Sequence, residues 1–191
     1  MNSQTLFECN DLSVGYGRPL TSEINLSISS REILFIKGKN GSGKSTFIKT
    51  ILGKNKALAG NYKWHLNSES ISYLPQITNP TSHFSFTINE ILDLYNISRT
   101  FRDKLPKGLE GKKWIDASGG EKQKVMLLTR LSDETKVLIL DEPFNHLDQE
   151  SIDSFVDLLV NIVSENKLSI ILVSHLEIEL PNELQKTVEL K

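Results

Sequence analysis

The chain has 191 residues, and its 22 basic and 24 acidic side chains give a formal net charge of −2. Domains that bind nucleic acid are usually strongly basic, so we expect no nucleic-acid partner. The hydrophobic share of 38% approaches the globular average once the 11 glycines are added, which excludes disorder as a description of the whole chain. The length favours a single domain spanning residues 1–191.

Cysteine content and apolar runs bear on the compartment. Cys9 is the single cysteine, so no disulfide can form within the chain, as is typical of a reducing cytosol. The apolar runs at 137–140 and 170–173 are far shorter than the roughly 20 residues of a membrane-spanning helix. The first five residues lack the basic start and apolar stretch of a secretory signal. We therefore expect a chain that neither crosses a bilayer by itself nor is exported.

The first half of the chain reads mostly as strand. Residues 5–9 and 24–29 have the alternation or apolar run of antiparallel strands, and 32–37 is a short apolar run typical of a strand covered on both faces. A helix should run from Lys44 to about Leu52 and end at Gly53. Residues 60–75 predict further strand, most firmly at 71–74.

The second half predicts alternating helices and strands. We expect a small, mostly helical insertion at about 79–117, where 87–90 has the spacing of a capping box. The remaining residues, 1–78 and 118–191, would form the core with a β subdomain. Apolar spacing predicts helices from residue 119 and over 152–163, and buried strands at 136–140 and 169–173. This alternation is typical of an α/β fold with a parallel sheet.

A glycine-rich segment after the strand at 32–37 matches the Walker A pattern G-x-x-x-x-G-K-[S/T]; its residues are Gly38, Lys39, Asn40, Gly41, Ser42, Gly43, Lys44, Ser45 and Thr46. Backbone N–H groups of such a loop converge on phosphate oxygens, and the lysine adds a point charge. The alternative is a chance match in a glycine turn, which average composition allows in less than about 1% of chains of this size. The segment therefore predicts nucleotide binding.

Two carboxylates, Asp141 and Glu142, follow the apolar run at 137–140. A single aspartate at a strand end is usually a helix cap or a solvated turn residue. Two adjacent carboxylates at the tip of a buried parallel strand lie where ligands bind, so we interpret this pair as a Walker B strand. Asp141 would reach Mg²⁺, and Glu142 would act as the base for water.

A third segment makes the combination specific. Residues 117–121, Ala-Ser-Gly-Gly-Glu, stand about twenty residues before the Walker B strand, where the ATP-binding-cassette (ABC) ATPase domain has its signature L-S-G-G-Q. The chain resembles that family. The resemblance implies a P-loop NTPase core with a mostly parallel sheet, a small antiparallel β subdomain and a short helical insertion. Ala117 departs from the leucine of the pattern, and Glu121 replaces its glutamine.

Other family elements follow in order along the chain. Tyr16 resembles the aromatic residue that stacks on adenine, Gln76 the Q-loop glutamine and His175 the switch histidine. Residues 143–148 resemble the D-loop, which ends in Asp148. Taken alone, each could be an ordinary turn, loop or strand-end residue. Together they occur in the order that the ABC ATPase family has, over nearly the whole chain, and this order favours the resemblance.

The resemblance implies ATP and Mg²⁺ as cofactors, and it assigns roles to residues. The catalytic candidates are Glu142, His175, Gln76 and Asp148; the magnesium candidates are Ser45, Gln76 and Asp141; the nucleotide-binding candidates are Tyr16, Gly38, Asn40, Gly41, Ser42, Gly43, Lys44, Ser45, Thr46, Ser118, Gly119 and Gly120. The family places the segment 118–120 on ATP bound to a second cassette, so a head-to-tail pair is expected. Hydrolysis would remove the phosphate that bridges the pair.

The leading hypothesis is an ATPase subunit that drives a transmembrane permease on a separate chain, located in the cytoplasm on the inner face of the membrane. The permease would dock near 76–105, where Phe84, Phe86, Ile88 and Tyr95 either form a groove or pack as the insertion's own core. The alternative is a soluble ABC protein that acts on ribosomes or another macromolecule. The segment Asn-His-Leu-Asp at 145–148 also resembles the D-loop of such proteins. A small-molecule P-loop kinase would leave Ser118 and His175 without a role.

Overall fold

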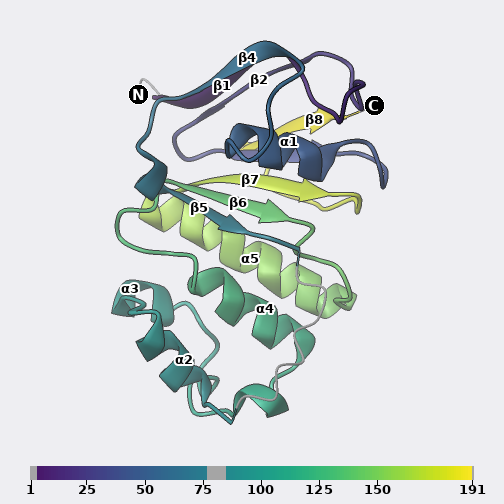
Figure 1. Ribbon diagram of the computed structural model, residues 1–191. Coiled ribbons are helices and arrows are strands. Elements are labelled where there is room, and N and C mark those ends of the chain that lie inside the picture. Colours follow the sequence, from purple (N-terminus) through teal and green to yellow (C-terminus); the bar gives the residue numbers. More distant parts are fainter. Residues whose placement is uncertain (1–3, 77–84, 191) are drawn as a thin grey trace.

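The computed structural model describes residues 4–76 and 85–190, and it contains two sheets and several helices in stacked layers (Figure 1). The strands are β1 (Thr5–Ser13), β2 (Ile24–Ser29), β3 (Ile33–Lys37), β4 (Ala59–Trp64), β5 (Ile71–Leu74), β6 (Val137–Asp141), β7 (Ser169–Ser174) and β8 (Gln185–Glu189). The helices are α1 (Lys44–Ile51), α2 (Ile88–Leu94), α3 (Arg99–Arg102), α4 (Gly119–Leu128) and α5 (Gln149–Asn166). The α/β class predicted from the sequence is confirmed.

The two sheets differ in direction. A three-stranded sheet has the order β2-β1-β4, with both pairs antiparallel, which confirms the antiparallel pairing predicted for 5–9 and 24–29. A five-stranded parallel sheet has the order β5-β6-β7-β3-β8. Helix α1 lies between the two sheets, and α4 and α5 cover the other face of the parallel sheet (Figure 1).

Two apolar cores explain why the central parallel strands carry unbroken apolar runs between their ends. Along β3, Leu34 and Ile36 pack in one core with α1 and the antiparallel sheet, whereas Ile33 and Phe35 pack in the other with α4 and α5. Successive side chains of a strand point to opposite faces, so a strand covered on both sides needs apolar residues throughout. This arrangement confirms the buried-strand interpretation of 32–37.

Two details of the sheets differ from the prediction. The segment 60–75 is split between the sheets, because β4 joins β1 while β5 joins β6, and a single 3-10 turn at Ser68–Ser70 lies between them. Strand β8 was not predicted: it is a half-buried edge strand with polar residues at four of its five positions. Sheet membership depends on which strands pair, and local sequence patterns carry little information about that.

Helix α1 has the predicted limits. It begins at Lys44 and ends at Ile51, with Leu52 as its C-cap. Gly53 follows in the left-handed conformation (φ 72°), and its N–H donates to the Thr50 carbonyl at 2.9 Å. A glycine adopts this conformation without the steric cost that a Cβ atom brings, so the chain can turn back toward β4.

Short helices occupy the described part of the region predicted as an insertion. The capping box at Thr87 and Glu90 is present at the start of α2, as predicted. Ile88 is fully buried and belongs to the core, whereas Phe86 and Tyr95 are 49% and 46% exposed. Of the two alternatives stated for these side chains, Ile88 follows the insertion's own core, whereas Phe86 and Tyr95 keep about half of their surface exposed; Phe84 lies outside the described residues.

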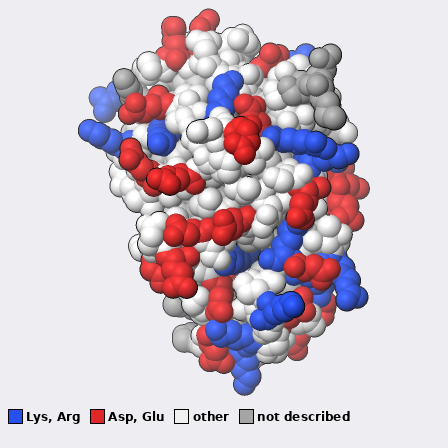
Figure 2. Space-filling view, turned by 180° about the vertical axis from the view of Figure 1, so that it is seen from behind, with Lys and Arg blue, Asp and Glu red and all other residues white. Residues whose placement is uncertain are grey.

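Charges of both signs are mixed over the face that Figure 2 shows. The protein also has ion pairs, such as Arg102 with Asp93 at 2.6 Å and Lys112 with Glu121 at 2.7 Å. Within residues 4–76 and 85–190, no helix has both the length and the apolar character needed to cross a membrane.

Candidate nucleotide site

The site begins with the loop that connects β3 to α1. Gly41 and Gly43 have φ values of 85° and 88°, in the region that favours glycine. At Gly43 a Cβ atom would also lie 2.8 Å from Cγ2 of Thr21. Among the residues that the structure describes, no side chain caps the N-terminus of α1, which begins with Lys44. The first backbone N–H groups of α1 can therefore bind an anion, and the helix dipole favours negative charge there.

Lys44 is nearly buried, with 5% of its surface exposed. Its Nζ donates to the carbonyl oxygens of Gly38 at 2.6 Å and Lys39 at 3.0 Å. The same Nζ lies 3.3 Å from Oε1 of Glu142. The ammonium group is thus held over the loop by two backbone oxygens and one carboxylate, where it can neutralise phosphate charge.

Asp141 ends β6 and is 4% exposed. Its Oδ1 accepts a hydrogen bond from Ser45 Oγ at 3.2 Å, and its Oδ2 accepts one from the Tyr73 hydroxyl at 3.2 Å. Burial raises the pKa of this carboxyl, and the hydrogen bonds from Ser45 and Tyr73 oppose that rise. Asp141 forms no ion pair with the described residues. A buried carboxylate beside a hydroxyl supplies the hard oxygen ligands that Mg²⁺ prefers.

Glu142 follows β6 with a left-handed backbone (φ 50°), and its N–H still donates to the Val173 carbonyl at 2.9 Å. Its Oε2 lies 2.8 Å from His175 Nδ1 and also accepts from the His175 backbone N–H at 3.3 Å. The two residues follow neighbouring strands, β6 and β7, whose carboxyl ends meet at one edge of the sheet. A carboxylate held between Lys44 and His175 can accept a proton from water.

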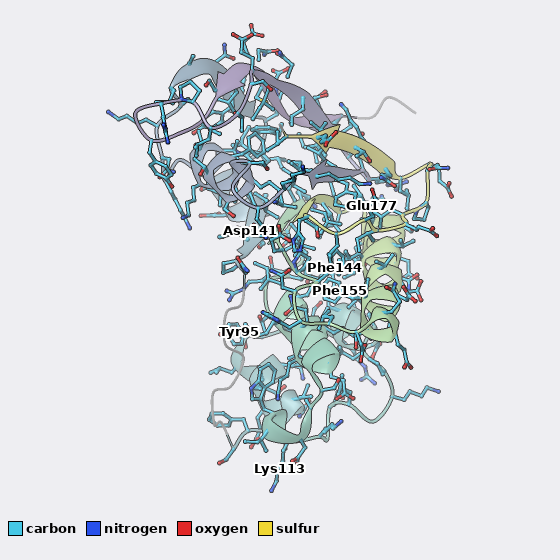
Figure 3. The ribbon with its side chains drawn as sticks, turned by 90° about the vertical axis from the view of Figure 1, so that its right-hand side faces the viewer. Tyr95, Lys113, Asp141, Phe144, Phe155 and Glu177 are labelled. Carbon is cyan, nitrogen blue, oxygen red and sulfur yellow. The ribbon has the colours of Figure 1, made fainter. Side chains whose placement is uncertain are left out.

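Two aromatic rings hold the chain just after these carboxylates. Phe144 and Phe155 pack edge to face, with ring centroids 5.7 Å apart and an interplanar angle of 85°. Figure 3 shows the pair beneath Asp141, on the side of α5. Because both rings are buried, the segment from Glu142 to Phe144 is anchored to α5.

The glycine-rich loop, Glu142 and His175 line a cleft of about 390 Å³, within the size range of small-molecule pockets, and Asp141 is not among its lining residues. Its lining includes nine predicted site residues: Asn40, Gly41, Gly43, Lys44, Ser45, Thr46, Gln76, Glu142 and His175. Leu20 and Asn145 also line it, and the sequence analysis did not assign them a role. Asn145 lies within the segment that resembles the D-loop, which was a usable signal; nothing local marked Leu20.

Other predicted residues lie outside this lining. Tyr16 is 65% exposed, and its hydroxyl accepts a hydrogen bond from Asn55 Nδ2 at 3.3 Å. Asp148 is the N-cap of α5 and accepts from the Ser151 N–H at 2.8 Å. Gly38 and Ser42 stand in the loop beneath the cleft, where Gly38 contributes its carbonyl to Lys44.

The signature segment is also outside the cleft. Ser118 is the N-cap of α4, where its hydroxyl accepts from the Glu121 N–H at 3.2 Å and Glu121 Oε2 accepts from the Ser118 N–H at 2.7 Å. The sequence analysis missed this capping box, although its Ser-x-x-Glu spacing is visible. Gly119 and Gly120 lie against Leu147 and Ser151, at the start of α5. The segment therefore does not line the cleft of its own chain.

The fold and the cleft define an α/β nucleotide-binding protein of the P-loop NTPase class. The family model for the ABC transporter family matches residues 21–145, and the chain belongs to that family. It is 32% identical to a zinc import ATP-binding protein ZnuC from Paracoccus denitrificans, covering 86% of this chain and 68% of that protein. A second ZnuC, from Buchnera aphidicola, is 34% identical over 88% of this chain and 73% of its own length.

A solved structure supports the same fold. The chain is similar to cbiO1 from Clostridium perfringens, described as part of the ABC transporter complex cbiONQ, with a TM-score of 0.80. The likeness covers 98% of this chain and 85% of that one at 24% identity. The family resemblance read from the sequence is thus confirmed, and the chain is an ABC ATPase.

Proposed function

We propose that this chain hydrolyses ATP with Mg²⁺ as one of two paired cassettes, and that the cycle drives a transmembrane permease on a separate chain. The observation that carries the proposal is the convergence of Lys44, Glu142 and His175 on one cleft beside the glycine-rich loop. Family membership supports ATP as the nucleotide.

The loop would bind the triphosphate. Backbone N–H groups from Gly41 to Thr46 and the ammonium of Lys44 would hold the phosphates, with further contacts at Asn40 and Ser42. Tyr16 would stack on adenine from outside the cleft, where its exposed ring is available. Leu20, which lines the cleft, would add an apolar contact.

Ser45, Asp141 and Gln76 would hold the metal ion. The oxygens of Ser45 and Asp141 already lie 3.2 Å apart, and the charge of Asp141 is not balanced by an ion pair among the described residues. When bound, Mg²⁺ neutralises phosphate charge and polarises the terminal phosphoryl group. Gln76, two residues after the end of β5, lines the same cleft and would complete the oxygen set.

Glu142 would orient the attacking water and accept its proton, and His175 would contact the terminal phosphate. The 2.8 Å contact between Glu142 and His175 Nδ1 supports this pairing because each fixes the orientation of the other. Asp148 would couple the two sites of a cassette pair through the segment before α5.

The position of Ser118, Gly119 and Gly120 supports a second cassette. They do not line the cleft of their own chain, and they begin α4, so the Ser118 hydroxyl, as a donor, and the N–H groups of Gly119 and Gly120 would bind a phosphate on another chain, while the Ser118 N–H stays bonded to Glu121. A head-to-tail pair would then enclose each nucleotide between the loop of one chain and the signature of the other. Loss of the terminal phosphate would remove that contact and favour the open form.

The permease would dock on the region between Gln76 and Leu105 from the cytoplasmic side. Phe86, Leu94 and Tyr95 are exposed there, and exposed apolar side chains favour a protein contact. Because the ZnuC relatives are named zinc import proteins, a divalent-metal importer is the first permease to test. The substrate would be selected by the permease rather than by this chain.

The test is nucleotide binding and phosphate release by the purified chain and its Lys44→Ala variant, with and without Mg²⁺. The wild type should release phosphate without a phosphorylated acceptor, and the variant should lose binding or turnover. Full activity of Lys44→Ala would refute the role of the loop. Co-purification in detergent with a multi-span membrane protein would support the transporter, whereas sedimentation with ribosomes would favour the soluble alternative.

A further inference from the structure

Tyr73 makes a contact with the candidate magnesium ligand that the sequence analysis did not foresee. It lies on β5, the edge strand next to β6, and its hydroxyl donates to Oδ2 of Asp141 at 3.2 Å. The other oxygen, Oδ1, accepts from Ser45. The two carboxylate oxygens of Asp141 therefore have different partners, one from α1 and one from the neighbouring strand.

Strand register brings the two side chains to the same face of the sheet. Tyr73 pairs with Ile139 in the parallel ladder, and Asp141 is two residues further along β6. Side chains two apart along a strand share a face, so Ile139 and Asp141 both project toward α1, as Tyr73 does. The phenol reaches past its paired residue to the end of β6, where the ladder between β5 and β6 has stopped at Leu74.

The ring of Tyr73 has two kinds of contact. It packs against the core that α1 shares with the parallel sheet. In addition, Nζ of Lys54 lies 5.0 Å from the ring centroid, a cation–π arrangement. Lys54 is itself fixed just after α1, because its backbone N–H donates to the Lys49 carbonyl at 2.8 Å. The hydroxyl of Tyr73 is therefore directed at Asp141 by packing.

The consequence concerns the orientation of a terminal carboxylate. The torsion that turns the two oxygens of an aspartate is soft, so side-chain packing alone sets it only weakly. A hydrogen-bond donor to each carboxylate oxygen of Asp141 fixes this torsion. With Oδ2 held by Tyr73, Oδ1 faces Ser45 Oγ, which is the pair of oxygens assigned to Mg²⁺.

We propose that Tyr73 is a positioning residue for the metal site: its hydroxyl holds Asp141 so that Oδ1 is presented beside Ser45. This inference rests on the proposed function, since it concerns the metal that the nucleotide requires. Partners that orient a metal ligand from the second layer typically contribute 10- to 100-fold to metal affinity. Tyr73 acts through Asp141 and does not itself touch the nucleotide or the metal.

The test is Tyr73→Phe, which keeps the ring, its packing and the contact with Lys54, and removes the hydroxyl alone. Tyr62→Phe is the matched control, because Tyr62 packs against the same core from β4. Mn²⁺ binding in the presence of a non-hydrolysable ATP analogue is measured by electron paramagnetic resonance. Nucleotide retention in EDTA and the melting temperature are measured in parallel.

Tyr73→Phe should weaken Mn²⁺ binding by about tenfold, whereas Tyr62→Phe should leave it within about twofold. The Mg²⁺ concentration for half-maximal ATPase should rise in step, and the rate should recover at saturating Mg²⁺. A merely structural role would lower the melting temperature without this metal dependence. Mn²⁺ affinity of Tyr73→Phe within about twofold of wild type would overturn the inference. Failure of the wild type to bind Mn²⁺ with the analogue would instead refute the proposed function.

Discussion

Lys44 and Glu142 form an ion pair in which Nζ and Oε1 are 3.3 Å apart, with 6% and 8% of the two side chains exposed. The lysine comes from the start of α1 and the glutamate from the end of β6, so the contact joins the phosphate loop to the strand that carries the acidic residues. Opposite charges this deeply buried are strongly coupled. A substitution of Lys44 is therefore expected to affect the role of Glu142 in hydrolysis, and a substitution of Glu142 is expected to affect phosphate binding by Lys44.

The first prediction concerns Glu142→Gln. The amide keeps the size of the side chain, and its one oxygen can accept from Lys44 or from His175, which contact different oxygens of the carboxylate, but it cannot take a proton from water. The rate of ATP hydrolysis should fall by about 10²- to 10⁴-fold, while nucleotide binding is kept.

Phosphate release and gel filtration with ATP check this prediction. ATP-bound pairs of the Glu142→Gln chain should accumulate, because the step that separates them is blocked. Glu183→Gln, on an exposed residue before β8, controls for loss of one negative charge and should behave as wild type. Unchanged turnover in Glu142→Gln would show that another group activates water.

The second prediction separates the two glycines of the signature. At Gly120 a Cβ atom would lie 2.7 Å from Cβ of Ser151 on α5, whereas at Gly119 the nearest atom is Leu147 Cδ2 at 3.8 Å. Gly120→Ala should force α4 and α5 apart and cost about 1–3 kcal/mol in the free energy of unfolding. Gly119→Ala should leave that free energy within about 0.5 kcal/mol of wild type.

Both glycine variants should lose ATP-dependent pairing, but only Gly120→Ala should melt at lower temperature. Thermal unfolding and light scattering with a non-hydrolysable analogue distinguish the two effects. Normal pairing of Gly119→Ala would place the nucleotide contact elsewhere on the chain.

The third prediction concerns the pH dependence of stability at Glu121. Partial burial opposes ionisation, yet the hydrogen bonds from Lys112 and the Ser118 N–H lower the pKa of Glu121 overall. A carboxyl with a lowered pKa in the folded state stabilises the protein above its ordinary pKa, and this stabilisation is lost as the pH falls through the folded value. Glu121→Gln should therefore cost about 0.5–1 kcal/mol at pH 7, and the difference from wild type should vanish in acid.

Denaturant unfolding at a series of pH values measures this difference. Lys112→Met is the partner variant, and the double variant should cost less than the two single changes together because they remove the same pair. Full additivity, or a difference between wild type and Glu121→Gln that does not decrease as the pH falls, would contradict the assignment.

The fourth prediction tests Tyr16, which is largely exposed and contributes little to the core. Tyr16→Ala should weaken ATP binding by about tenfold, because stacking of a base on an aromatic ring contributes about 1–3 kcal/mol. Tyr16→Phe keeps the ring and should bind ATP within about threefold of wild type, although it loses the hydrogen bond to Asn55. Equal weakening in both variants would point to the hydroxyl rather than to stacking.

Features that depend only on residues close together in the sequence could be predicted from the sequence alone. The limits of α1 follow from a glycine at each end, and the capping box at Thr87 follows from a four-residue spacing. The residues of the phosphate loop are contiguous in the sequence, and so are the two carboxylates at the end of β6. Each group can therefore be recognised from a short sequence motif. The cap at Ser118 is encoded in the same local way, by its Ser-x-x-Glu spacing.

The amino-acid sequence by itself determined the parallel core, the loop and the class of ligand, because alternation, turn residues and short motifs act over a few residues. The tertiary structure alone decided which strands share a sheet, and it placed Tyr73 on Asp141, 68 positions away. It also set Glu142 between Lys44 and His175 and put Ser118 outside its own cleft. These relationships arise from strand order and register, and no local pattern encodes them, since the free energy that selects them comes from burying two apolar cores at once.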